Sequence, residues 1–324
     1  MLAALLLQGC GENGKSKKDG SGNAIKKARV VESFDTSRRI GAGGEISFQW
    51  KKSDSLCAHV STEELTELAS KHNNEIERLI AFRALLMKNS HEAVSLAISE
   101  IEDTTIVHTT SGCCGSEDMA SNIRIEMIQY NREQYHVSKE DSVRLDSAVL
   151  FSENGSKFDY SNDLYHRLPA RPEYENRLWQ LYEHTPYALI PLAKYRKEEV
   201  KKEIVRLLRL LTEMNNKDLW PYCDTIRSVL DAVVVWPSPS YKQQVRHICQ
   251  KVLNNKDRLG FTNYAFGALM AYNDQWSYNC IDKALSKSKQ REKLYYDDCW
   301  SFHEAYEDNP QPLFKPLIKK YPIE

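Results

Sequence analysis

The chain has 324 residues, of which 44 are lysine or arginine and 45 are aspartate or glutamate, so its net charge is −1. This even balance excludes a general electrostatic attraction to nucleic acid, and the length is enough for one large or two ordinary domains. Only 13 glycines and 11 prolines occur, which favours helices over an all-β fold with many turns.

The first ten residues form a short apolar stretch that ends in a cysteine. Leu2–Leu7 is apolar, and Leu7-Gln8-Gly9-Cys10 leads into an abruptly polar sequence. This segment resembles the lipobox of bacterial lipoproteins, in which a signal peptidase cuts before a lipidated cysteine. The resemblance implies a signal segment over 1–10 and an acyl anchor, such as palmitate, on Cys10. Because Gly11 and not aspartate follows, it also implies the outer membrane, facing the periplasm.

Residues 11–28 are rich in Gly, Ser, Asn and Lys and carry no hydrophobic period. Such a segment cannot bury a core, so we expect a flexible tether between the anchor and the folded part. Beyond it we expect an α+β region over 29–172 and a helical region over 173–324. No other apolar run approaches the roughly 18 residues that span a bilayer, so the lipid is the expected membrane attachment.

The α+β region combines helix start signals with alternating segments. Ser61 with Glu64, and Asn74 with Glu77, have the spacing of capping boxes, and Ser90 is a third expected N-cap. Apolar residues alternate with polar ones over 46–50 and 143–151, which predicts strands, and a further strand is expected over 105–109. Asn154-Gly155 is a hairpin signal.

The helical region shows one amphipathic segment after another. The clearest is 198–214, where Val200, Ile204, Leu207 and Leu211 recur at helical spacing. The succession of helices resembles the layout of HEAT-like or armadillo-like α-solenoids, and an irregular helical bundle is the alternative. The expected fold class is therefore mainly α with a small β component, including a short β-hairpin in the N-terminal half.

Eight cysteines occur, a number that suits an oxidising periplasm. Cys113-Cys114 precedes a predicted helix, whose dipole lowers the pKa of a thiol, and His108 is near enough in sequence to act as a base. These cysteines therefore have three interpretations, which are a disulfide that involves Cys57, structural thiols, and a reactive thiol site.

Asp297, Glu304 and Asp308 share one side of a predicted helix, opposite Tyr295 and Phe302. This acidic side is interpreted either as a solvated face or as an interaction surface for a basic partner. A single helix does not bring paired carboxylates together across a cleft, as acid–base catalysis requires.

Catalytic and metal-binding motifs are missing from the sequence. It contains no GxSxG, CxxC or HExxH pattern, so we assign no catalytic residues, metal or cofactor. We expect a periplasmic lipoprotein that binds another protein as a scaffold, for example an immunity protein that neutralises a toxin. The alternatives are an accessory subunit of an envelope assembly and a thiol-dependent or other envelope enzyme.

Overall fold

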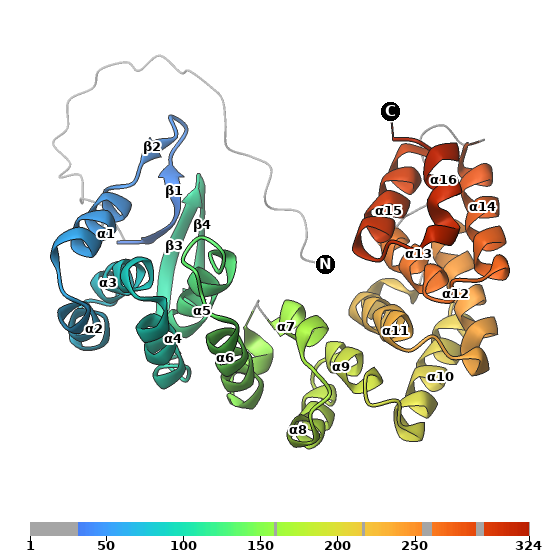
Figure 1. Ribbon diagram of the computed structural model, residues 1–324, viewed down its shortest axis with the longest axis horizontal. Helices are drawn as coiled ribbons and strands as arrows, with labels where there is room; N and C mark the ends of the chain where they lie inside the picture. The colour runs from blue at the N-terminus through green and yellow to red at the C-terminus, as the bar shows by residue number, and fades with distance from the viewer. Residues whose placement is uncertain (1–31, 159–160, 216–217, 255–260, 290–294, 324) are drawn as a thin grey trace, which may run out of the picture. The chain divides into compact units, whose positions relative to one another are not determined.

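Helices make up most of the chain, and a small four-stranded sheet lies in its N-terminal half (Figure 1). The computed structural model describes residues 32–158, 161–215, 218–254, 261–289 and 295–323. The expected fold class, mainly α with a small β component, is confirmed. Cys10 and the expected tether over 11–28 lie outside the described residues.

The sheet has the strand order β2-β1-β3-β4. Its β1 pairs in parallel with β3, whereas the β1–β2 and β3–β4 pairs are antiparallel. One face packs on helices through Phe34, Val107, Leu79 and Ile123, which form a small core of their own. The strands are β1 (Phe34–Ile40), β2 (Glu45–Ile46), β3 (Ile106–Gly112) and β4 (Cys114–Met119).

The expected helix starts near residues 61 and 74 are confirmed. The Ser61 hydroxyl accepts a hydrogen bond from the Glu64 amide while the Glu64 carboxylate accepts one from the Ser61 amide, and Asn74 caps the next helix. Asn89, not Ser90, is the third N-cap. The helices of this half are α1 (Phe48–His59), α2 (Thr62–Lys71), α3 (Glu75–Lys88), α4 (Ser90–Ser99), α5 (Ala120–Tyr130) and α6 (Lys139–Phe151).

Two predicted strands are mostly helical. In the segment 46–50 only Ile46 belongs to a strand, as the last residue of β2, and α1 begins at Phe48. Phe48 is 76% exposed while Trp50 is buried, so the alternation did not mark one buried face. Residues 143–151 belong to α6, where Leu145 and Val149 are buried one helical turn apart. The predicted hairpin turn is also wrong, because Gly155–Lys157 forms a 3₁₀ turn.

The second half consists of helices in succession, and 198–214 forms the long helix that its spacing predicts. In chain order they are α7 (Ser161–Arg167), α8 (Pro172–Tyr182), α9 (Leu189–Ala193), α10 (Glu198–Glu213), α11 (Cys223–Val235), α12 (Lys242–Asn254), α13 (Thr262–Met270), α14 (Gln275–Lys289), α15 (Tyr295–Asp308) and α16 (Lys315–Lys320). Short 3₁₀ turns precede several of them, for example Pro186–Ala188 and Pro239–Tyr241.

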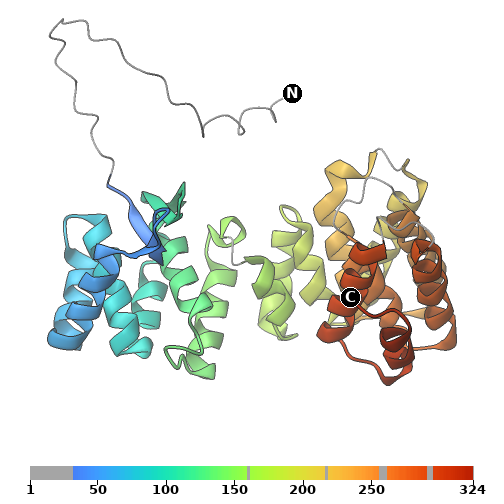
Figure 2. The same cartoon turned by 90° about the horizontal axis from the view of Figure 1, so that it is seen from above.

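These helices pack in two rows (Figures 1 and 2). In one row α9, α11, α13 and α15 each contact the next, and in the other α10 contacts α12. Contacts of α13 with α12 and α14 join the rows. The apolar residues between them continue the main core, which α3, α4, α6 and α8 share. The resemblance to HEAT-like repeats and the division near residue 172 remain predictions.

Candidate functional site

The acidic residues expected on the helix over 295–308 are exposed along one side of α15. Asp297, Glu304 and Asp308 are exposed, whereas Phe302 is buried in the core. Trp300 lies three residues after Asp297 and four before Glu304, so it belongs to the same stripe. The stripe therefore combines carboxylates with a large aromatic side chain.

A stacked pair of aromatic rings lies within this acidic stripe. Trp300 is 54% exposed and Tyr296 is 53% exposed. Their ring centroids are 6.3 Å apart and the ring planes are 28° from parallel. Because the two rings already stack on each other, a partner that covers them orders few additional side-chain rotamers. The loss of side-chain conformational entropy on binding is therefore small.

The carboxylates of the stripe have no cationic partner in the described part of the chain. Asp297, Glu304, Glu307 and Asp308 make no ion pair with the described residues. Repulsion among like charges on one face is unfavourable, and a cationic side chain of a partner would relieve it. We name the surface formed by Tyr296, Asp297, Trp300, Glu304, Glu307 and Asp308 the α15 face.

The negative charge of the α15 face reaches the two neighbouring helices of its row. Burial raises the pKa of Asp231 on α11 to about 7, and the charge of Asp308 adds to this rise. On α13, burial raises the pKa of Tyr264, with further contributions from Asp231 and Glu304. The charges of Asp308 and Glu304 on α15 therefore act on ionisable groups of both α11 and α13.

Asp231 also has a histidine neighbour. Its carboxylate oxygen lies 3.5 Å from Nε2 of His166 on α7. Burial, together with the charge of Lys194, lowers the pKa of His166. A carboxyl group with a raised pKa beside a neutral imidazole is a pair that can exchange protons. Neither residue lines the cavity of about 420 Å³ between α12 and α14.

Cys113 and Cys114 lie at the turn between β3 and β4, which corrects the expected location. The next helix, α5, begins only at Ala120, so no helix N-terminus faces these thiols. Their sulfur atoms are 4.0 Å apart, and the hydrogen bond with Cys113 raises the pKa of Cys114. His108 pairs with Glu117, with 3.1 Å between Nδ1 and Oε1. The expected thiolate activation therefore has no geometric basis here.

The disulfide expected at Cys57 is not formed among the described residues. Cys57 lies on α1, and Cys57, Cys113 and Cys114 are all thiols. A bond from Cys57 in the oxidised protein remains a prediction.

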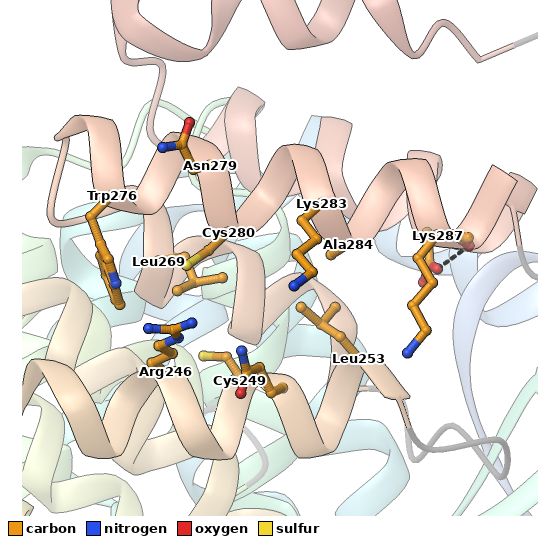
Figure 3. A pocket seen from close by; sticks show the side chains of 13 residues that line it. Arg246, Cys249, Leu253, Leu269, Trp276, Asn279, Cys280, Lys283, Ala284 and Lys287 are labelled. Carbon is orange, nitrogen blue, oxygen red and sulfur yellow. Dashed lines mark hydrogen bonds between the residues drawn. The ribbon is translucent and has the colours of Figure 1, made fainter.

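A cavity of about 420 Å³ lies between α12 and α14 (Figure 3). Arg246 and Cys249 of α12 face Cys280 and Lys283 of α14 across it. Burial raises the pKa of both thiols, which keeps them protonated. Sequence reasoning missed this cavity because its two walls are about thirty residues apart and each helix shows only an ordinary amphipathic pattern.

Comparison with known proteins returns no matching family model, no matching curated protein and no matching solved structure. Function is therefore argued from the residues of this chain.

Within the described ranges, no cluster of His, Cys, Asp and Glu side chains has the arrangement of a metal site. No described helix has both the length and the hydropathy needed to cross a bilayer.

Proposed function

We propose that the chain is a protein-binding scaffold and that the α15 face receives a basic segment of its partner. The observation that carries the proposal is the exposed, stacked Tyr296–Trp300 pair, set among carboxylates that form no ion pair with the described residues. Tryptophan and tyrosine are enriched among the residues that dominate binding energy at interfaces. Lysine and arginine are attracted both to carboxylates and to the faces of aromatic rings.

The location of this scaffold is argued from the sequence. Cys10, through its resemblance to a lipobox, would anchor the chain in the outer membrane, with the residues after it as a tether. In one version the scaffold is an immunity lipoprotein, and the basic segment belongs to the toxin that it neutralises. In another version it is an accessory subunit that docks onto an envelope assembly. Both versions use the same surface and differ in the partner.

The enzyme alternative has less support than binding. A thiol-dependent reaction needs a thiolate, whereas Cys114, Cys249 and Cys280 all have raised pKa values. The His166–Asp231 pair, with 3.5 Å between the two groups, does not line the cavity between α12 and α14.

The proposal is tested by photo-cross-linking in living cells. A photoreactive amino acid replaces Tyr296 in the full-length protein, and in a control it replaces Phe48, an equally aromatic residue of α1 that is 76% exposed. The proposal predicts one dominant protein adduct from position 296 and none from position 48. It also predicts that Asp297→Lys with Glu304→Lys abolishes the adduct. Equal adducts from both positions, or none from position 296, would contradict it.

A further inference from the structure

A second cavity, far in sequence from the α15 face, lies between the sheet and the helices of the N-terminal half. It has a volume of about 370 Å³ and is lined from β1, α1, α3, α5 and the segment that follows α5. Small-molecule sites have volumes of roughly 300–1,000 Å³, so this cavity is large enough for a small ligand.

Arg83 lines this cavity and is almost completely buried, with 1% of its surface exposed. Its guanidinium carbon lies 4.4 Å from the ring centroid of Phe34 and 4.2 Å from that of Trp50. Its Nη2 donates a hydrogen bond to the Asp35 carbonyl oxygen at 2.5 Å. Nε and Nη1 are also buried, and neither has a hydrogen-bond partner among the described residues.

Arg124, an equally buried arginine on α5, has carboxylate partners for its guanidinium, although its Nε has no hydrogen-bond partner among the described residues. Arg124 forms ion pairs with Glu75, Glu100 and Asp103 at 2.7, 3.1 and 3.0 Å. Arg83 forms no ion pair with the described residues. Removing a charge from water without a partner is strongly unfavourable, so the two arginines differ in how far nearby carboxylates compensate their charge.

Asp35 and Asp54, two carboxylates whose charges act on Arg83, have hydrogen-bond or ion-pair partners of their own. The Asp35 carboxylate accepts a hydrogen bond from Ser47 at 2.5 Å, and Asp54 pairs with Arg38 at 3.1 Å. Their charges still act on Arg83 at longer range, but burial outweighs them and lowers the pKa of Arg83 to about 9. The positive charge is therefore only partly offset by the protein itself.

Other groups that line the cavity are also hydrogen-bond donors without partners. The indole Nε1 of Trp50 and the hydroxyl of Tyr135 are buried and unpartnered. Glu126 is the single carboxylate in the lining. Acceptor oxygens of Thr36, Glu126, Asn131 and Gln134 also line the cavity, but among the described residues none of them is hydrogen-bonded to Nε or Nη1 of Arg83, although buried donors almost always find acceptors.

The rest of the lining is mixed, because Thr36, Arg38, Tyr130, Asn131 and Gln134 are polar and three other residues form an apolar patch. Leu86 of α3, with Ile123 and Met127 of α5, lines the cavity alongside the donor groups. Such a patch is suited to hydrocarbon and not to a fully hydrated ion such as phosphate.

We propose that this cavity binds a small organic monocarboxylate, with the carboxylate on Arg83 and Tyr135 and the apolar body against Leu86, Ile123 and Met127. A charge-assisted hydrogen bond is roughly twice as strong as a neutral one, so a carboxylate gains more here than an amide of the same shape. This site is independent of the α15 face, and neither proposal requires the other.

The test is titration calorimetry on the full-length protein with hexanoate, 3-phenylpropanoate, their neutral amides, and inorganic phosphate. We expect at least one carboxylate to bind about tenfold more tightly than its amide, and phosphate to give no signal. Lack of binding by both carboxylates up to about 10 mM, equal binding of the amides, or binding of phosphate alone would overturn the proposal.

Three variants assign the binding to this cavity. Arg83→Met should abolish carboxylate binding. This variant should remain folded because an apolar side chain replaces a poorly compensated charge. Tyr135→Phe keeps the ring and removes one donor, so we expect affinity to fall about threefold or more. Arg246→Gln, in the cavity between α12 and α14, is the matched control and should bind like the wild type. Loss of binding in the control, or unchanged binding in Arg83→Met, would overturn the assignment.

Discussion

Asp231 lies on α11 with its side chain only 14% exposed, and three charged or ionisable neighbours face it. His166 of α7 is 3.5 Å away, Asp308 of α15 raises its pKa, and Arg227 of α11 lowers it. Burial is the largest influence, and the pKa of Asp231 is about 7. A basic group of a partner placed beside Asp308 would favour ionisation of Asp231, so binding and protonation are linked at this residue.

This shift predicts a pH dependence of stability. The pKa of Asp231 is raised from 3.8 to about 7 in the folded protein, so between these values the folded state binds more protons than the unfolded state. Its contribution to stability therefore falls as pH rises from about 4 to about 7. Asp231→Asn removes the ionisable group, so the variant does not lose this stability as pH rises. We expect the variant to exceed the wild type by roughly 2 kcal/mol in free energy of unfolding at pH 8.

The measurement is urea unfolding of both proteins at pH 4.5 and pH 8. At pH 4.5 the two free energies of unfolding should be similar, because Asp231 is protonated in the folded wild type. Asp308→Asn separates the two causes of the raised pKa. Without the charge of Asp308 the pH dependence of stability should become smaller, but burial should keep it from disappearing. A wild type as stable as Asp231→Asn at pH 8 would show that burial does not raise this pKa.

Within one of the two helical rows, Lys251 of α12 connects α12 to α10. Its Nζ donates hydrogen bonds to the carbonyl oxygens of Leu211, Thr212 and Met214 at the C-terminal end of α10. The last carbonyls of a helix have no partner within the helix and carry partial negative charge. The partly buried ammonium group of Lys251 therefore caps α10 and ties it to α12.

Lys251→Met should lower the free energy of unfolding by about 1–3 kcal/mol, because the carbonyls lose a cationic donor while the aliphatic stem remains. Thermal or urea denaturation measures the change. Lys202→Met, at an exposed position of α10, is the control and should change stability by less than about 0.5 kcal/mol. Equal effects of the two substitutions would mean that the cap is unimportant.

Helices with a single apolar face could be predicted from the sequence, as α10 and α15 show. In each, buried residues recur every three or four positions, as with Ile204 and Leu208. The strand predictions for 46–50 and 143–151 were wrong. A few alternating apolar residues are compatible with both a strand and a helix when only some of them are buried. Tertiary packing, and not local pattern, decided which residues of α1 and α6 face the core.

The two candidate sites also differ in how far the sequence alone could predict them. The α15 face was visible in the sequence because helical spacing alone places Asp297, Glu304 and Asp308 on one side. The cavity at Arg83 was not, because Trp50, Arg83 and Tyr135 come from three separate segments. Only the folded structure shows that an arginine inside an apolar helix is buried without a carboxylate partner.

At the scale of the whole molecule, the proposed scaffold depends on an anchor that the sequence alone supports. Cys10→Ser removes the thiol to which a lipid would attach, so we expect the full-length protein to move from the membrane to the soluble fraction. Fractionation followed by immunodetection measures this, with Cys57→Ser as a control that should stay with the membrane. Membrane association that is unchanged in Cys10→Ser would rule out the lipid anchor.

The central claim is that the α15 face binds a basic segment of a protein partner. The most direct measurement is the dissociation constant between the full-length protein and the partner captured at position 296. We predict that Asp297→Lys with Glu304→Lys weakens binding at least about tenfold, as loss of central charge pairs does at other interfaces. Glu63→Lys with Glu199→Lys, the same charge change at exposed positions of α2 and α10, should leave it unchanged. An equal loss in both double variants, or no loss in either, would contradict the account.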